Sequence, residues 1–231
     1  MKWTEEEMKE KMNLIHNMDC LSFMKQVPDN YFDLVLTDIP YEECAVENSG
    51  LFTKAWDTMD KADRKTFELN EFLVESDRIG SGSLYIFCGI GQISTIRNYL
   101  NKSHTTRLVI WEKPNPAPFN AQHVFLSGIE TCVWGKKPSA TFNEFFKNTV
   151  FRYPKGIDKS YHPTTKPLKL FEEFIKISPN AGDKVFDACM GSGTTAIASK
   201  ALDRDWCGCE LESDYVAIAN KRLKQVQGSL F

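Results

Sequence analysis

Short hydrophobic runs, rich in β-branched and aromatic residues, recur along the chain between turn residues. They predict strands at 32–37, 83–88, 107–111, 130–134, 184–189 and 206–211. Apolar residues with helical spacing predict helices at 20–26, 64–79, 168–177, 194–202 and 214–226. Because strands alternate with helices, we expect an α/β fold, with a mostly parallel twisted sheet and helices on both of its faces.

The composition is that of a single globular domain spanning residues 1–231, with 42% hydrophobic and 26% charged residues. No apolar run reaches the ~18 residues of a membrane span, and the charged N-terminus does not resemble a secretory signal. The seven cysteines have no framework spacing, which predicts reduced thiols and a cytoplasmic location. Cys207 and Cys209 share one face of a predicted strand, so we expect core thiols and no metal.

The charge is unevenly distributed. A net charge of −3 argues against a protein that coats nucleic acid. Between residues 136 and 169, however, eight lysines and arginines outnumber two acids, and aromatic residues are interleaved with them. This composition suits phosphate contacts and base recognition, although a solvated loop over a small hydrophobic cluster has the same composition. The irregular segment 42–60 is either a mobile loop over the site or an ordinary surface insertion.

A glycine-rich loop follows the predicted strand that begins at Lys184. Gly191, Gly193 and Ala196 fit the relaxed pattern Gly-x-Gly-x-x-(Gly/Ala), and Glu210 ends the next strand, 19 residues after Gly191. A carboxylate at that place can accept hydrogen bonds from ribose hydroxyls, so the unit predicts a nucleoside-containing ligand. A plain tight turn is the alternative. Few residues follow this unit, which favours a cofactor without pyrophosphate, such as S-adenosylmethionine, in a permuted sheet.

The predicted strand 32–37 leads directly into Asp38-Ile-Pro-Tyr41. This sequence places a carboxylate, a proline-restricted turn and an aromatic ring at the carboxyl end of a strand, where ligands bind in open α/β sheets. A capping aspartate followed by a proline turn would have the same sequence.

These motifs resemble those of the amino-group DNA methyltransferases. Residues 38–41 resemble the family's (Asp/Asn/Ser)-Pro-Pro-(Tyr/Phe) signature, and residues 186–194 look like its S-adenosylmethionine loop. His-Pro-Thr-Thr-Lys-Pro at 162–167 and the segment 111–118 are similar to two further family segments, and 19–20 match a position that contacts adenine. The catalytic motif precedes the cofactor loop, which is the order of the permuted β group.

The resemblance implies a Rossmann-like fold with a seven-stranded sheet that contains one reversed strand. It also implies that S-adenosylmethionine is the cofactor. The chain then divides into a catalytic half (13–135), a target-recognition insertion (136–160) and a cofactor-binding half (161–231). The implied cofactor contacts are Asp19, Cys20, Thr164, Lys166, Asp187, Gly191, Gly193, Thr194 and Glu210.

The implied chemistry is methyl transfer to the amino group of a flipped base. Asp38 and the main-chain carbonyl of Ile39 would accept the two amine hydrogens, Pro40 would hold the loop rigid, and Tyr41 would stack on the base. Ile39 stands where the family has its first proline, so the loop is expected to be less rigid. Aspartate, rather than serine, at position 38 favours adenine-N6 over cytosine-N4.

Double-stranded DNA is the implied partner, and a homodimer is an expected assembly because many members of the β group are dimers. A non-catalytic DNA-binding relative and a dinucleotide-dependent oxidoreductase remain the alternatives. The resemblance and the basic composition together predict these DNA contacts: Lys113, Asn115, Lys136, Lys137, Arg152 and Lys155.

Overall fold

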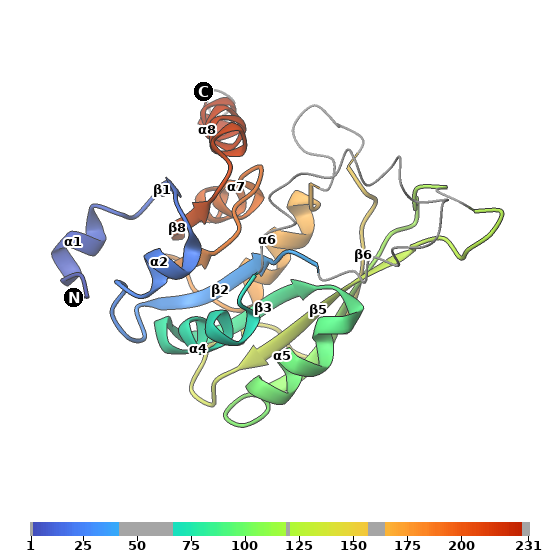
Figure 1. Cartoon of the computed structure of the whole chain (residues 1–231), viewed down its shortest axis with the longest axis horizontal. Helices are drawn as coiled ribbons and strands as arrows, with labels where there is room; N and C mark the ends of the chain where they lie inside the picture. The colour runs from blue at the N-terminus through green and yellow to red at the C-terminus, as the bar shows by residue number, and fades with distance from the viewer. Residues whose placement is uncertain (1, 42–66, 119–120, 157–164, 228–231) are drawn as a thin grey trace.

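The computed structural model describes residues 2–41, 67–118, 121–156 and 165–227 (Figure 1). Its centre is an eight-stranded sheet with the strand order β1-β8-β7-β2-β3-β5-β4-β6. The strands are β1 (Leu14–Asn17), β2 (Phe32–Asp38), β3 (Gly80–Cys88), β4 (Thr105–Glu112), β5 (Ile129–Lys136), β6 (Val150–Arg152), β7 (Lys184–Asp187) and β8 (Asp205–Glu210).

All six predicted strands are confirmed. Among the described strands only β5 is reversed, since it pairs antiparallel with both β3 and β4 while the other pairs are parallel. The expected count of seven strands was wrong, because β1 and β6 add short edges that the hydrophobic pattern did not reveal. These strands have four and three residues, and their outer positions are exposed.

The five predicted helices are confirmed with small shifts at their ends. Residues 64–66 of the expected helix 64–79 lie outside the described part, and α1, α5 and the short 3₁₀ turn η2 were not predicted. The helices are α1 (Glu5–Lys9), α2 (Cys20–Met24), α4 (Leu69–Ile79), η2 (Ile90–Gln92), α5 (Ile93–Leu100), α6 (Leu168–Ile177), α7 (Thr194–Ala201) and α8 (Ser213–Gln227).

Helices pack against both faces of the sheet (Figure 1), and the side chains of strand β3 divide between two hydrophobic cores, one on each face. Leu84 and Ile86 are buried in the core that contains α2, α4 and α5. Tyr85 and Phe87, the alternate residues, are buried in the core that contains α6, α7 and α8. Each such side chain contributes about 1.5–3 kcal/mol on burial, so the period-2 pattern holds a helical layer on each face.

The strand order reverses between β2 and β7. From β2 the chain builds outwards through β3 to β6, and it then returns to form β7 on the other side of β2, with Leu34 paired to Val185. In an open α/β sheet such a switch point leaves a crevice beyond the carboxyl ends of the two strands. The residues that follow β2 and β7 therefore meet there.

Two further expectations concern the cysteines and the membrane. The six cysteines of the described part are free, and Cys207 and Cys209 are buried in the core as predicted. No helix within the described ranges is long and apolar enough to cross a membrane.

Candidate active site at the switch point

The two sequence motifs meet at the carboxyl edge of the sheet. Asp38, the last residue of β2, lines one cavity together with Lys166, Asp187 and Gly191. The cavity measures about 50 Å³. Ligand sites usually enclose ~300–1,000 Å³, so a large ligand can bind here only if the lining side chains move.

Asp38 lies at the centre of a network of polar side chains. The Tyr41 hydroxyl donates to Oδ1 of Asp38 at 2.9 Å. The Lys166 ammonium forms a close ion pair with Oδ2, and its side chain is only 6% exposed. The carboxylate is thereby held in one orientation at the end of β2, with oxygen lone pairs left to accept further hydrogens.

Glu130, which sequence reasoning missed, completes this network from β5. Its Oε2 atom lies 3.0 Å from Nζ of Lys166 and 3.3 Å from the Tyr41 hydroxyl. Its Oε1 atom accepts from Nζ of Lys113 at 3.3 Å. Because β5 is reversed, its first residues lie at the same edge of the sheet as the last residues of β2. No sequence motif marks this position.

The ionisation of the network follows from this pairing. Burial alone would lower the pKa of Lys166, but the charges of Asp38 and Glu130 outweigh burial and raise it. Burial likewise works to raise the pKa of Glu130, yet Lys166 and Lys113 bring it below its usual value. Burial, followed by the two carboxylates, raises the pKa of Tyr41 well above its usual value. At neutral pH Glu130 and Lys166 are therefore charged, and Tyr41 keeps its proton.

The turn after Asp38 is held by the backbone and by one buried side chain. The amide of Ile39, which is buried, donates to the Phe87 carbonyl at 3.2 Å. Gln92, also missed from the sequence, donates from Nε2 to the Pro40 carbonyl at 2.9 Å and accepts from the Gly89 amide at 2.9 Å. This buried amide supplies a restraint at a turn in which Ile39 replaces a proline.

The glycine loop has the backbone that its sequence predicts. Gly191 and Gly193 have φ values of +51° and +84°, which are costly for other residues. A Cβ atom at Gly193 would lie 2.8 Å from Cβ of Ala219 on α8, whereas one at Gly191 would meet nothing within 4 Å. Gly193 thus lets α8 pack closely, and Gly191 leaves space beside the loop backbone.

Carboxylates gather around this loop. Oε2 of Glu210 accepts from the Gly191 amide at 2.7 Å, and burial raises the pKa of Glu210. Asp187 is buried and accepts from the Cys189 amide at 3.0 Å and from the Thr195 hydroxyl. Burial raises the pKa of Asp187 to about 6.

The remaining predicted cofactor contacts lie beside the same edge, with one exception. Asp19 caps α2 by accepting from the Ser22 amide at 2.8 Å, and Cys20 is buried behind it. The pairing of β1 with β8, in which Asn17 faces Glu210, brings this cap close to the loop. Thr194 lines the cavity as the first residue of α7. Thr164 lies outside the described residues.

Four of the six predicted DNA contacts lie at the carboxyl edge of the sheet, where Asp38 and the glycine loop meet. Lys113 points inward to Glu130, while Arg152 is 69% exposed and lies 3.3 Å from Oε1 of Glu112. Asn115 joins the β4–β5 loop to the segment after β6, because it donates to the Lys155 carbonyl at 3.2 Å and accepts from the Lys155 amide at 2.7 Å.

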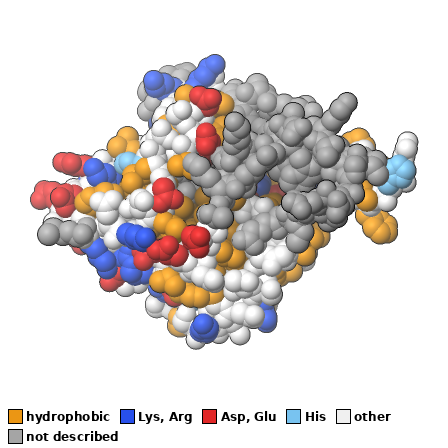
Figure 2. Space-filling view, in the orientation of Figure 1, with side chains coloured by type: hydrophobic (Ala, Val, Ile, Leu, Met, Phe, Trp, Pro, Cys, Tyr) orange, Lys and Arg blue, Asp and Glu red, His pale blue; other side chains and the backbone are white. Residues whose placement is uncertain are grey.

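The other two predicted contacts, Lys136 and Lys137, lie apart from these four. The reversed strand β5 ends with Lys136 at the opposite edge of the sheet, where Nζ of Lys137 lies 3.1 Å from Asp77 and 2.6 Å from the Gly80 carbonyl. Figure 2 shows acidic and basic side chains interspersed over α1, α2 and α4, so that face presents no uniform basic surface.

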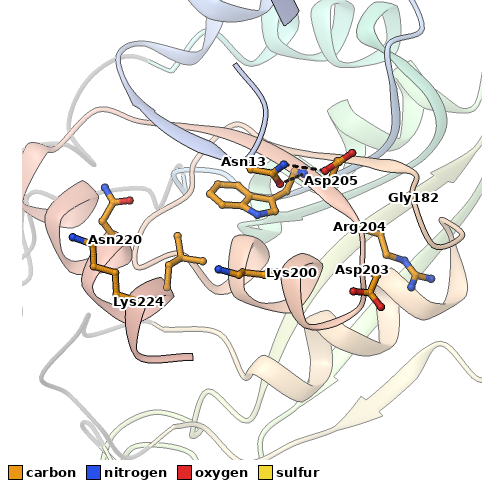
Figure 3. Close-up of a pocket in the computed structure, with 10 residues that line it drawn as sticks. Asn13, Gly182, Lys200, Asp203, Arg204, Asp205, Asn220 and Lys224 are labelled. Carbon is orange, nitrogen blue, oxygen red and sulfur yellow. Dashed lines mark hydrogen bonds between the residues drawn. The ribbon is translucent and has the colours of Figure 1, made fainter. Parts of the chain in front are cut away.

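A larger hollow of about 520 Å³ lies at this opposite edge (Figure 3). Its lining includes Gly182, just before β7, and Asp205, which begins β8 and accepts from Asn13 at 2.9 Å. Three cationic residues there, Lys200, Arg204 and Lys224, face two acids, Asp203 and Asp205. Since it lies at the amino ends of the strands, this hollow is separate from the network around Asp38.

Comparison with known proteins identifies the family. The family model described as DNA methylase matches residues 32–221, which include both Asp38 and the glycine loop. The chain belongs to this DNA methylase family. The resemblance seen in the sequence motifs is thus confirmed, and so is the Rossmann-like methyltransferase fold.

Relatives of the methylase match over most of their length. It is 27% identical to the type II methyltransferase M2.MboI of Moraxella bovis, over 92% of this chain and 88% of that protein. It is 28% identical to the type II methyltransferase M.HinfI of Haemophilus influenzae, over 96% of this chain and 71% of that protein. The match thus leaves 29% of M.HinfI and 12% of M2.MboI without a counterpart in this chain.

Solved structures agree with the fold. The crystal structure of the M1.HpyAVI-SAM complex has a TM-score of 0.69 and 27% identity, and covers 91% of the methylase and 98% of that chain. PvuII DNA methyltransferase (cytosine-N4-specific) has a TM-score of 0.68 at 15% identity, covering 94% of each chain, and supports the fold alone.

Proposed function

We propose that this DNA methylase transfers a methyl group from S-adenosylmethionine to the N6 amine of adenine in double-stranded DNA. Methyl transfer to DNA is the activity of the family. The observation that carries the site assignment is that Asp38 and Gly191, from distant parts of the chain, line one cavity. Aspartate in the signature, where other members have serine, favours adenine over cytosine as the target.

The residues around the glycine loop fit the chemistry of this cofactor. The open side of Gly191 allows a ligand to approach the backbone closely. Glu210 keeps acceptor capacity for ribose hydroxyls after binding the Gly191 amide, and Asp19 lies on the neighbouring strand–helix turn. When bound, S-adenosylmethionine supplies a methyl group whose bond to sulfur breaks, with its electron pair passing to sulfur, as the amine lone pair forms the C–N bond.

The catalytic residues act on the amine. Its lone pair is delocalised into the base, and it becomes positively charged as the new bond forms. Asp38 and the Ile39 carbonyl accept hydrogen bonds from the two N–H groups of the amine and stabilise its positive charge. After the methyl group has been transferred, the extra proton passes to water. Gln92 holds the turn in place through Pro40, which preserves the positioning on which in-line transfer depends.

The target amine is unreachable within a duplex, so the base has to be flipped into the site, where we assign stacking to Tyr41. Asn115, Arg152 and Lys155 are proposed DNA contacts at this edge, and Lys113 binds there only if it leaves Glu130. We assign target recognition to the interval 136–160. Within it, β6 runs parallel to β4 and therefore ends at the same carboxyl edge of the sheet. Because its relatives are bacterial methyltransferases, we place the enzyme in the bacterial cytoplasm.

The test is methylation of DNA by the purified protein with S-adenosylmethionine, followed by hydrolysis and mass spectrometry of the nucleosides. We expect N6-methyl-2′-deoxyadenosine, and we expect Asp38→Ala to lower the single-turnover rate by about 10²–10³-fold while the variant still binds S-adenosylhomocysteine. N4-methylcytosine would instead support the alternative target. Folded protein that binds the cofactor but methylates neither base would contradict the proposal.

A further inference from the structure

Glu130 is the acidic residue of the active-site network that the mechanism above does not use. It comes from the reversed strand β5, far from either motif in the chain, and its side chain is 22% exposed. It contacts Lys166, Tyr41 and Lys113 through its two oxygens. Two of these residues, Lys166 and Tyr41, also bind Asp38.

The charges of this network balance. Asp38 and Glu130 contribute two negative charges, and Lys166 and Lys113 contribute two positive charges. Without Glu130 the network would carry a net positive charge, and Lys166 would be paired with Asp38 alone. Because the side chain of Lys166 is almost fully buried, water would screen that excess charge poorly.

We infer that Glu130 is a positioning residue and counter-ion for Lys166, and that it keeps the site from repelling the cationic sulfonium of the methyl donor. The inference rests on the proposed function. Lys166 orients Asp38, but alone it would also cancel the negative charge that Asp38 presents. Glu130 holds Lys166 from the other side and restores the balance, both for the bound sulfonium and for the amine that becomes positive during transfer.

The test compares two ligands that differ in charge at sulfur. S-adenosylmethionine carries a positive sulfonium, and S-adenosylhomocysteine lacks both the methyl group and the charge. We expect Glu130→Gln to weaken the binding of S-adenosylmethionine about tenfold more than the binding of S-adenosylhomocysteine, as measured by calorimetry. This is the size expected for one unit charge in a partly buried site. The rate of transfer at saturating ligand falls as well.

Three further variants separate charge from structure. Glu71→Gln removes the same charge from an exposed pair with Lys25 on α4, and is expected to leave the ratio of affinities unchanged. Glu130→Asp keeps the charge and is expected to keep most of the ratio. Lys113→Met gives the network a net negative charge and is expected to strengthen the binding of S-adenosylmethionine relative to S-adenosylhomocysteine. This variant provides a test even if Glu130→Gln fails to fold.

The outcomes are distinct. Parallel weakening of both ligands in Glu130→Gln would overturn the inference, because a merely structural residue would act on both alike. An unchanged ratio in Glu130→Gln would overturn it too, as would an unchanged ratio in Lys113→Met. If the wild-type protein bound neither ligand, the cofactor assignment would fail first, and the inference with it.

Discussion

The ammonium of Lys166 is paired with the carboxylate of Asp38, although 128 residues separate them in the chain. Lys166 belongs to the segment 162–167 and was itself predicted to contact the cofactor, yet its side chain pairs with Asp38 and Glu130. One buried cation thus links the signature after β2, the strand β5 and the segment that leads into α6. The catalytic edge depends on this link as much as on either motif.

Lys166→Met should destabilise the protein by about 2–4 kcal/mol at pH 7, because it leaves two partly buried acids without their main partner. Lys166 lowers the pKa of Glu130, so the stability contributed by Glu130 is present above its unfolded pKa and is lost as pH falls through the lower folded value. The difference between wild type and variant should therefore shrink towards pH 4. Urea unfolding at both pH values measures it.

The matched control for this prediction is Lys25→Met, which breaks an exposed pair with Glu71 at 2.7 Å. We expect little change in stability from it at either pH. An equal loss for Lys166→Met at pH 7 and pH 4 would show that packing, rather than charge, accounts for the effect.

Gln92→Ala should lower the transfer rate by about 10–100-fold while the protein remains folded. The variant loses the donor to the Pro40 carbonyl and the acceptor for the Gly89 amide, so the catalytic turn is no longer held in one position. Because two buried backbone groups lose a partner, we also expect a destabilisation of about 1–3 kcal/mol. Single-turnover kinetics and urea unfolding provide the two numbers, and an unchanged rate would exclude a positioning role.

Gly193→Ala and Gly191→Ala are both expected to destabilise the protein, but by different amounts and for different reasons. At Gly193 a methyl group meets α8 at 2.8 Å from Cβ of Ala219, and the positive φ adds strain, so we expect a loss of about 2–4 kcal/mol. At Gly191 the new methyl group meets no atom, so the loss should be about 1–2 kcal/mol, with weaker cofactor binding. Denaturant unfolding and calorimetry distinguish the two, and equal stabilities would contradict the packing of α8.

The contribution of Asp187 to the free energy of unfolding should fall as pH rises from about 4 to 6. Its folded pKa is raised from 3.8 to about 6, so in this window the folded state holds a proton that the unfolded state has lost. The difference in unfolding free energy between wild type and Asp187→Asn should change by about 3 kcal/mol across the window and stay constant above it. A difference that did not vary with pH would show that Asp187 is ionised throughout.

The sequence was sufficient for features that depend on local backbone chemistry. The positive φ of Gly191 and Gly193 and the acid at the end of β8 each follow from residue type and spacing. The alternation of strands with helices along the chain likewise predicted a sheet covered on both faces. The meeting of Asp38 with the glycine loop then follows from a general rule for parallel sheets, and the structure agrees.

Features that depend on the direction of a strand or on long-range register were not predictable. Nothing local to Glu130 shows that β5 is reversed, so its place beside Asp38 was missed. The same reversal carries Lys136 and Lys137 to the far edge, away from the other four predicted DNA contacts, which the sequence could not show. Gln92 lies in a three-residue turn and gains its partner only through the fold.

The adjacency of β2 and β7 also bears on biosynthesis. A ribosome releases Asp38 early and the glycine loop late, and β8, which pairs with β7 and ends in Glu210, emerges later still. A polypeptide that ends before β7 therefore has Asp38 but neither the glycine loop nor Glu210. Products truncated at that point are expected to be unable to methylate DNA.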